Sequence, residues 1–336
     1  MGFNSCKSVI VLLVDGLGLA NLEAFQGHAP NLMRAMKAKP ASIRTECPST
    51  TVASVASLLT GVRSAEHGLI GYNVLDPRQG EVVNLLSGWE VNGNDPAEWK
   101  KVQPLATRHT NVCVVSQDVY RNSGFTSLTT GSATFYGEAS IGERLQTASR
   151  LANRLGQVVY CYVPELDQAG HRFGSTSDQW LSALEELDSA FGHASKSSVA
   201  AWVITGDHGM VDVQANDHIY LDQLGSLSNI DFKVGGDTRC AFLYFDEPGD
   251  SGTLAKDLSS ELSSAAWVTT WPQLVEAGWQ VQGSVSRTLP DLVVLARSSV
   301  AFYDRRTAKP SSLKMIGHHG SITDSETRVP LIRLGL

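Results

Sequence analysis

The segment Lys7-Ser-Val-Ile-Val-Leu-Leu-Val-Asp15-Gly16 is a short β-branched apolar run that stops at an Asp-Gly pair. Such a run is typical of a strand that is buried on both faces and ends at the edge of a parallel sheet. Similar runs predict further strands at 111–116, 157–163, 200–205 and 291–297. Helical patterns alternate with them, at 31–39, 51–59, 141–155 and 178–191. The alternation predicts an α/β fold, a three-layer sandwich around a largely parallel central sheet.

The length of 336 residues is about twice that of a usual single domain, which allows two domains or one large domain with insertions. Two segments, 79–103 and 225–283, have weak periodicity and are rich in Gly, Ser and Trp. We therefore expect one α/β domain over residues 1–336, in which 79–103 and 225–283 are insertions or a cap over the site.

Composition and charge exclude several classes of protein. Apolar residues make up 42% and charged residues 18%, as in an ordinary globular chain. The net charge of −7 removes the attraction that binding of polymeric nucleic acid requires. The longest apolar run near the start, 9–14, is far shorter than the ~20 residues of a membrane-spanning helix, and no secretory signal is visible. These features favour a cytoplasmic protein with a small-molecule substrate and no membrane partner.

Candidate metal ligands occur at four places, each at the end of a predicted strand or in a loop. They are Asp15, Asp167 with His171, the adjacent Asp207 and His208, and the pair His318 and His319. In α/β proteins with a parallel sheet, bound molecules lie beyond the carboxyl ends of the strands, so we expect these side chains to meet there. Mixed Asp and His sets suit zinc-like ions, although each residue alone also fits a turn or a helix cap.

A hydroxyl-rich stretch, Pro48-Ser-Thr-Thr51-Val-Ala-Ser-Val-Ala-Ser-Leu-Leu-Thr60-Gly61, precedes and begins a predicted helix of small residues. A hydroxyl in this position is typical of a helix N-cap. The N-terminus of a helix also favours an anion, because its N–H groups and dipole point at the ligand. The same stretch can therefore cap the helix and present a nucleophile to a phosphate.

The order of these motifs resembles the alkaline phosphatase superfamily, and within it the nucleotide pyrophosphatase/phosphodiesterase branch. The matching motifs are Val-Asp15-Gly16, Thr51 with Leu-Thr60-Gly61, Glu66-His67-Gly68, Asp167-Gln-Ala-Gly-His171, Thr205-Gly-Asp207-His208-Gly209 and His319-Gly320. They reach from one end of the chain to the other and cover most of the predicted sheet. The two expected insertions match no motif of the family.

The resemblance implies a hydrolase of phosphoesters or nucleotides with two Zn²⁺ ions, or Mn²⁺ or another divalent ion in their place. It implies that Asp167, His171 and His319 hold one ion. It assigns Asp15, Asp207 and His208 to the other ion, with Thr51 beside it. Two ions ~4 Å apart can activate a hydroxyl and neutralise phosphate charge together, so the phosphoryl group would move to Thr51 and then to water.

The chain departs from the family pattern at two points. The nucleophile segment reads Ser49-Thr50-Thr51, so Thr50 is a rival, and counting back from Leu-Thr60-Gly61 selects Thr51. In the resembling phosphodiesterases an Asn after the His-Gly motif binds a phosphate oxygen, whereas here the ungapped position is Tyr72 and the Asn is Asn73. Both residues are therefore candidates for substrate binding.

Alternative functions stay open at this point. A phosphomonoesterase or phosphonate hydrolase would need cationic groups against the phosphate, and no arginine follows the nucleophile helix before Arg78. Arginines elsewhere could supply that contact, among them Arg121, Arg172 and Arg239. A non-catalytic protein with structural zinc is the remoter alternative, because structural sites are usually closed by four protein ligands. The predicted set has three ligands per ion and a hydroxyl.

Overall fold

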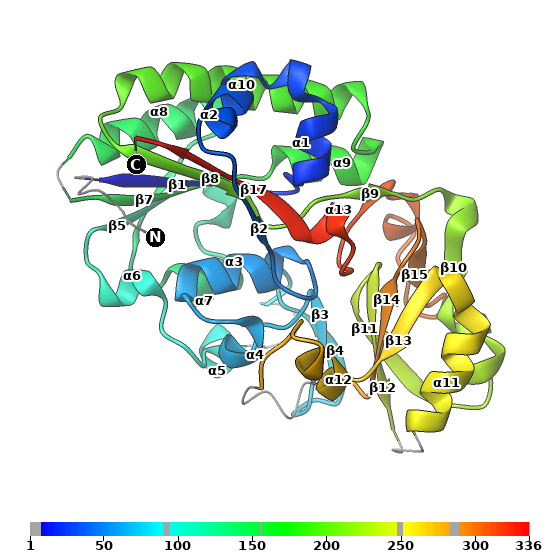
Figure 1. The fold of residues 1–336 in the computed structure, drawn as a ribbon. Coiled ribbons are helices and arrows are strands. Elements are labelled where there is room, and N and C mark those ends of the chain that lie inside the picture. The colour runs from blue at the N-terminus through cyan, green and yellow to red at the C-terminus, as the bar shows by residue number, and fades with distance from the viewer. Residues whose placement is uncertain (1–7, 90–94, 155, 247–250, 283–288, 336) are drawn as a thin grey trace.

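In the part of the chain that the structure describes, the main sheet has seven strands. Figure 1 shows how they lie. A computed structural model describes residues 8–89, 95–154, 156–246, 251–282 and 289–335. In spatial order the strands are β2 (Ser42–Arg44), β17 (Arg328–Leu334), β8 (Ala201–Gly206), β1 (Val9–Val14), β7 (Val158–Val163), β5 (Val112–Ser116) and β6 (Thr134–Gly137). The five strands from β8 to β6 are parallel, and β17 and β2 extend the sheet in antiparallel pairing.

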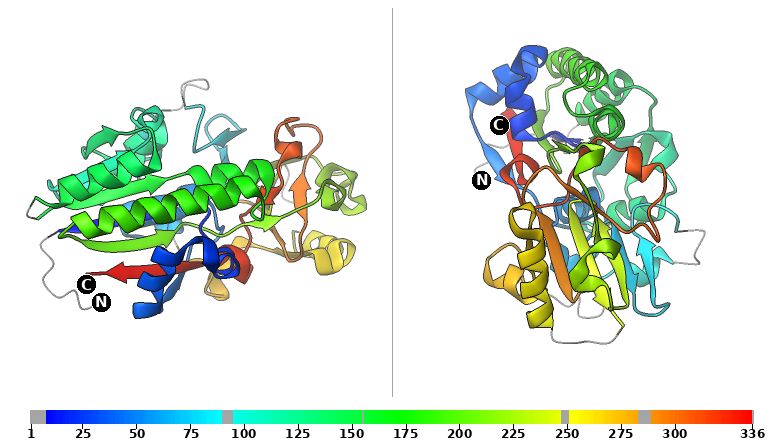
Figure 2. Two further views of the ribbon diagram at one scale, coloured as in Figure 1. Left: turned by 90° about the horizontal axis from the view of Figure 1, so that it is seen from above. Right: turned by 90° about the vertical axis from the view of Figure 1, so that its right-hand side faces the viewer.

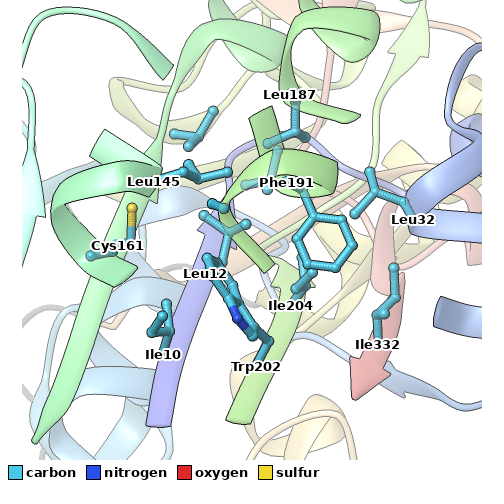
Figure 3. Close-up of a cluster of buried hydrophobic side chains, with 14 of the residues drawn as sticks. Ile10, Leu12, Leu32, Leu145, Cys161, Leu187, Phe191, Trp202, Ile204 and Ile332 are labelled. Atoms are coloured by element: carbon cyan, nitrogen blue, oxygen red, sulfur yellow. The ribbon is translucent and has the colours of Figure 1, made fainter. Parts of the chain in front are cut away.

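Helices cover both faces of this sheet, which confirms the three-layer prediction (Figure 2). One face carries α1 (Leu19–Ala24), α2 (Pro30–Ala38), α8 (Ile141–Ala152) and α10 (Asp178–Ser197), and the other carries α3 (Thr51–Thr60) and α7 (Gly124–Thr130). Alternate residues of β1 supply the two cores. Ile10 and Leu12 pack with Leu187 and Phe191 (Figure 3), whereas Leu13 packs on the α3 side.

A second sheet of six antiparallel strands lies beside the first (Figure 1). Its order is β13 (Ala266–Thr269), β14 (Leu292–Ala296), β12 (Cys240–Phe245), β11 (Phe232–Asp237), β3 (Asn73–Asp76) and β4 (Glu81–Asn84). The segments 79–103 and 225–283, which were expected to be insertions, supply four strands of this sheet, β4, β11, β12 and β13. The same segments also contain the helices α5 (Pro96–Trp99), α11 (Ser251–Leu262) and α12 (Trp271–Glu276). Their description as insertions within one domain stays a prediction.

The predicted strand 291–297 forms as β14, but its expected place in the parallel sheet was wrong. It pairs antiparallel with β12 and with β13 in the second sheet. All five residues of β14 are buried, so its apolar run matches that of a central parallel strand. A continuous apolar run indicates that a strand is buried on both faces, but it does not indicate which strands are its neighbours.

Several other short elements belong to the described part of the fold. They are α4 (Ser64–His67), α6 (Leu105–Arg108), η2 (Asp118–Tyr120), α9 (Glu165–Phe173), β9 (Val211–Asp212), β10 (His218–Tyr220), β15 (Ala301–Tyr303), β16 (Gly317–His318) and α13 (Asp324–Thr327). Among the described residues, no helix combines the length and the apolar composition that crossing a bilayer requires.

Candidate active site

The ends of three neighbouring strands bring the first carboxylates together. Val14 is in register with Val163 on one side and with Gly206 on the other, so Asp15 and Asp207 follow at the same edge of the sheet. Both carboxylates are buried, and the Gly16 N–H donates to Asp207 Oδ1 over 3.1 Å. Gly16 has φ +74°, and a Cβ there would lie 3.1 Å from the Asp167 Cα. Glycine at this position therefore lets α9 approach the strand end.

Helix α9 carries the next pair of candidate ligands. Asp167 and His171 are four residues apart, and His171 Nε2 lies 3.2 Å from Asp167 Oδ1, as the helical spacing predicts. The other ring nitrogen, Nδ1, donates to the Gly317 carbonyl over 2.8 Å. That contact fixes the ring with Nε2 toward the site.

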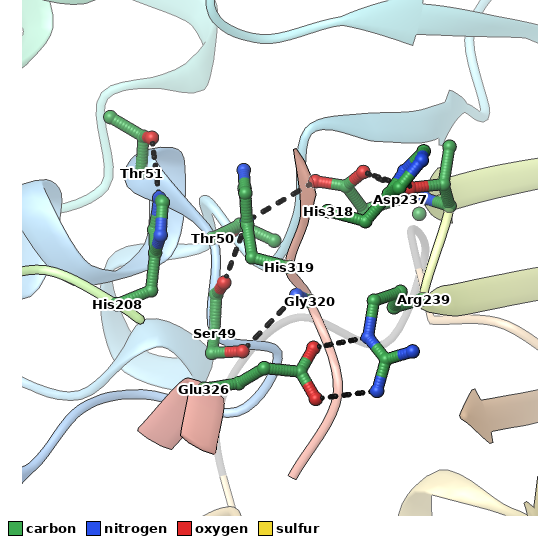
Figure 4. A network of polar contacts seen from close by, with 12 residues as sticks. Ser49, Thr50, Thr51, His208, Asp237, Arg239, His318, His319, Gly320 and Glu326 are labelled. Atoms are coloured by element: carbon green, nitrogen blue, oxygen red, sulfur yellow. Dashed lines mark hydrogen bonds and ion pairs between the residues drawn. The ribbon is translucent and has the colours of Figure 1, made fainter. Parts of the chain in front are cut away.

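His208 and His319 complete the group with stacked rings, whose centroids lie 3.6 Å apart. His208 Nε2 is 3.2 Å from Asp15 Oδ1 and 3.6 Å from Asp207 Oδ2. His319 Nδ1 contacts the Ser49 carbonyl at 3.0 Å (Figure 4). Its Nε2 is 3.9 Å from Asp167 Oδ1.

Two compact groups of ligand atoms, each within 4.8 Å, result from this arrangement. The first is Asp15, Asp207 and His208, the set that the family resemblance implies. The second is Asp167, His319 and His208, so His208 lies between the two groups, while His171 contacts the second group through Asp167.

The site has an excess of buried negative charge. Asp15 Oδ1, Asp167 Oδ1 and Asp207 Oδ2 are buried and have no hydrogen-bond partner among the described residues. Burial and the charge of Asp15 raise the pKa of Asp207 well above its usual value. Burial would raise the pKa of Asp15 too, but His208 beside it holds that pKa below its usual value. Buried carboxylate oxygens without a hydrogen-bond partner, with imidazole nitrogens among them, form a donor set that fits divalent cations of the zinc type.

The same carboxylates raise the pKa values of two histidines, His208 and His171. Burial alone would lower the pKa of His208, but the charges of Asp207 and Asp15 raise it to about 10. In His171 the charge of Asp167 likewise outweighs burial and raises the pKa to about 9. The carboxylates thus attract positive charge to this point of the fold, from a proton or from a cation.

The two rival hydroxyls occupy different positions. Thr50 is the N-cap of α3, and its Oγ1 accepts from the Ala53 N–H over 3.4 Å. Thr51 is the first residue of that helix, and its Oγ1 lies 3.2 Å from His208 Nε2 (Figure 4). Thr50 is fully buried, whereas Thr51 lines a cavity together with Asp15 and Asp167. The geometry therefore places Thr51 in the site and Thr50 behind it.

The cavity has a volume of about 470 Å³ and extends from the site between the sheet and the helices α3 and α7. The described residues that line it include the aromatic side chains of Tyr72, Trp89, Tyr120, Phe125, Phe135, Tyr160 and Tyr162, together with aliphatic and hydroxyl side chains. Among the described residues that line it, Asp15 and Asp167 alone are acidic or basic. A cavity of this size and lining accommodates an organic group of nucleoside size or smaller.

The substrate-binding candidates Tyr72 and Asn73 lie differently. Tyr72 lines the cavity with Thr51. The side-chain amide of Asn73 forms hydrogen bonds within the second sheet. Its nitrogen donates to the Gly236 carbonyl, and its oxygen accepts from the Asn84 side chain. The geometry favours Tyr72 as the residue that faces a substrate.

Two histidines left outside the ligand sets have partners of their own. His67 contacts Ser57 Oγ at 2.9 Å, and burial lowers its pKa to about 4. His318 contacts Thr238 Oγ1 at 2.9 Å and the Met315 carbonyl at 3.2 Å. Both are buried side chains whose ring nitrogens have partners.

Three polar residues near the site were missed from the sequence, and a fourth, Arg239, was named there only as an arginine that could contact the phosphate. Asp237, Thr238 and Arg239 form the turn between β11 and β12, and Glu326 lies on α13. Asp237 Oδ2 is 3.8 Å from His319 Nδ1, and Arg239 is in a buried ion pair with Glu326. Arg239 is therefore not available to clamp a phosphate. No spacing signal marks these residues, because the second sheet brings them to the site.

Comparison with known proteins identifies the class. The family model described as type I phosphodiesterase/nucleotide pyrophosphatase matches residues 9–322. The chain belongs to this family, whose description names hydrolysis of phosphodiester and nucleotide pyrophosphate bonds.

Two curated relatives show how far the likeness extends. A Schizosaccharomyces pombe protein described as an uncharacterised pyrophosphatase/phosphodiesterase is 27% identical over 67% of this chain and 49% of its own length. Human ectonucleotide pyrophosphatase/phosphodiesterase family member 1 is 24% identical over 71% of this chain and 27% of its own. The chain thus spans about half or less of the length of these two curated relatives.

Solved structures confirm the fold. Human ectonucleotide pyrophosphatase/phosphodiesterase 5 matches with a TM-score of 0.72 and 16% identity, over 96% of this chain and 87% of the other. The murine protein, described as an inactive threonine-to-alanine variant in complex with AMP, matches with a TM-score of 0.73, 16% identity and the same coverage. At this identity the likeness concerns the fold alone.

Proposed function

We propose that the protein is a metal-dependent phosphodiesterase or nucleotide pyrophosphatase that acts through Thr51 and two zinc ions. The observation that carries the proposal is the convergence of Thr51 Oγ1 with buried carboxylate oxygens of Asp15, Asp167 and Asp207 that have no hydrogen-bond partner among the described residues, at the end of a cavity lined in part by aromatic side chains. The family description supports the reaction class. Mixed carboxylate and imidazole donors favour zinc over magnesium, with manganese as an alternative.

The proposed metal ligands form two sets. Asp15, Asp207 and His208 would hold one ion beside Thr51, and Asp167, His171 and His319 the other. When bound, divalent cations supply Lewis-acid activation of a hydroxyl and neutralise phosphate charge.

The nucleophile is proposed to act from the start of a helix. Thr51 lies at the N-terminus of α3, where backbone N–H groups favour the phosphate anion. Its oxygen attacks phosphorus and the ester oxygen of the leaving group departs, so that the remaining phosphoryl or nucleotidyl group is on Thr51. Water then cleaves this ester and restores the hydroxyl. Inactivation of the murine relative by a threonine-to-alanine substitution supports a threonine nucleophile in this fold.

The cavity supports an ester with an organic substituent as the substrate. The described residues that line it include no basic side chain that would pair with the second negative charge of a phosphomonoester. The Tyr72 hydroxyl offers a neutral donor in the position where the resembling family has Asn. The AMP complex of the murine relative supports a nucleotide as that substituent.

A comparison of chromogenic esters tests this substrate class. We expect bis-nitrophenyl phosphate, or the nitrophenyl ester of thymidine monophosphate, to be cleaved with a kcat/KM about tenfold or more above that of nitrophenyl phosphate, because the second substituent gains contacts in the cavity. All three esters are assayed at the same metal concentration and pH. Tyr72→Phe is the matched variant, since it removes one hydroxyl and keeps the ring, and it should lower turnover of the diesters.

A tenfold preference for the monoester would contradict the diester assignment and favour the phosphomonoesterase or phosphonate hydrolase alternative. Failure of the zinc-loaded protein to release nitrophenol from every one of these esters would favour the non-catalytic alternative. The cytoplasmic location expected from the sequence stays a prediction.

A further inference from the structure

We propose that the buried ion pair between Arg239 and Glu326 fixes the position of His319 relative to two neighbours. These are the segment that carries Thr51 and the loop that carries His208. The inference rests on the proposed function, because it takes His208 and His319 as metal ligands. It assigns a role in the site to the second sheet, through the turn that carries Arg239.

The pair is bidentate and fully buried. Arg239 Nε lies 2.8 Å from Glu326 Oε1, and Nη2 lies 2.9 Å from Oε2. The remaining nitrogen, Nη1, donates to the carbonyls of Ser298 and Val300 over 2.9 Å each. The side chains of Arg239 and Glu326 are 1% and 0% exposed. Every nitrogen of the guanidinium is thus bonded, which fixes the position of the carboxylate.

Glu326 joins the two loops that carry the ligand histidines. Its Oε1 also accepts from the Ser321 N–H over 2.9 Å, two residues after His319. Its backbone carbonyl accepts from the Gly209 N–H over 2.8 Å, one residue after His208. A shift of Glu326 would therefore move both loops.

The nucleophile segment is bonded to the same loop from the opposite side (Figure 4). Ser49 Oγ donates to the Ser321 carbonyl over 2.7 Å and accepts from the Gly320 N–H over 3.2 Å. The Ser49 N–H donates to the Gly320 carbonyl over 3.1 Å, and the Ser49 carbonyl faces His319 Nδ1 at 3.0 Å. The loop at 319–321 is thus held between Glu326 and Ser49, and Ser49 lies two residues before Thr51.

Adjacent residues of the β11–β12 turn reach the same loop. Thr238 Oγ1 is 2.9 Å from His318 Nδ1, and Asp237 Oδ2 is 3.8 Å from His319 Nδ1. Three consecutive residues of the second sheet thus contact His318, His319 and Glu326. Contacts behind a ligand histidine set its orientation, so these contacts should affect metal affinity as well as folding.

The zinc affinity of the Arg239→Lys variant tests whether the ion pair positions the ligand histidines. Lysine keeps the charge but cannot form the bidentate pair or hold both carbonyls. Arg306→Lys is the matched control, because Arg306 forms a similar bidentate pair with Asp304 and contacts the Phe232 carbonyl instead of the His319 loop. Chelator-stripped proteins are titrated with zinc against a chromophoric competitor. We expect Arg239→Lys to bind zinc about tenfold or more weakly, and Arg306→Lys to stay within about twofold of the unchanged protein.

Ser49→Ala is the second variant, which leaves the ion pair intact and removes the two contacts of the Ser49 hydroxyl while the backbone contacts of Ser49 remain. It should weaken zinc binding at least threefold and lower kcat more than it raises KM. If Arg239→Lys does not fold, Glu326→Gln, which keeps the size of the side chain and removes the charge of the pair, takes its place with the same expected loss of zinc affinity. Zinc affinity within twofold of the unchanged protein in the folded variants would overturn the positioning role, even if their thermal stability falls. Failure of the unchanged protein to bind zinc would instead overturn the proposed function.

Discussion

Replacing Thr51 by alanine is expected to lower kcat/KM for a phosphodiester by at least about 10³-fold, because a nucleophile and the groups that activate it act as a unit. Thr51 Oγ1 lies at the start of α3 and 3.2 Å from His208 Nε2, and alanine removes that oxygen with little change in the buried backbone. Thr51→Ser keeps the oxygen and the helix N-terminus, so we expect it to retain part of the rate. Steady-state rates with bis-nitrophenyl phosphate measure both variants.

Thr50→Ala is the matched control for this prediction. Thr50 caps α3 over a long contact of 3.4 Å, so its loss should cost about 1 kcal/mol of stability or less. Its hydroxyl does not line the cavity, and we expect kcat/KM to stay within about tenfold of the unchanged protein. If Thr50→Ala were the more damaging substitution, Thr51 would not be the nucleophile.

Replacement of a candidate metal ligand is expected to have the second largest effect. Asp207→Ala or His171→Ala should each lower kcat/KM by about 100-fold or more, because each removes a group proposed to hold an ion that activates the nucleophile or neutralises the phosphate. Activity is assayed with zinc in excess, and the metal content of each variant is measured after desalting.

His193→Ala is the control for the histidine variant. His193 is an exposed residue of α10 that contacts the Ser189 carbonyl within its own helix, so its loss should leave the rate unchanged. A His171→Ala variant with full metal content and more than half of the activity would show that His171 is not a ligand.

The strand ends of the main sheet could be predicted from the sequence. The run at 9–14 and those before Pro164 and Gly206 mark buried parallel strands, and in the structure these strands pair with their ends level. Polar residues directly after such strands must gather at one edge, so the proximity of Asp15 and Asp207 followed from local patterns. The four-residue spacing of Asp167 and His171 likewise needed only a helical turn.

The second sheet could not be predicted in the same way. Its strands come from segments far apart in the chain, and β14 has the same apolar run as a parallel strand. The side chain of Asn73 is engaged by Gly236 and Asn84, contacts that depend on the pairing of β3 with β11 and β4. The preference for Tyr72 over Asn73 is therefore visible in the structure and not in the motif.

The positioning residues were hidden for a related reason. Arg239 and Glu326 are 87 positions apart, and a single Arg or Glu in a loop is most often a solvated surface residue. Their burial depends on the packing of the β11–β12 turn against the loop after His319. A sequence pattern reports contacts within an element far better than contacts between loops of two sheets.

Metal content of catalytically active protein tests the central claim most directly. The protein is loaded with zinc, desalted, and assayed for bound metal and for hydrolysis of bis-nitrophenyl phosphate on the same sample. The arrangement of Asp15, Asp167, Asp207 and the three histidines predicts two ions per chain, loss of turnover on removal by a chelator, and its return when zinc is added back. Full turnover by protein that holds almost no metal would contradict the account.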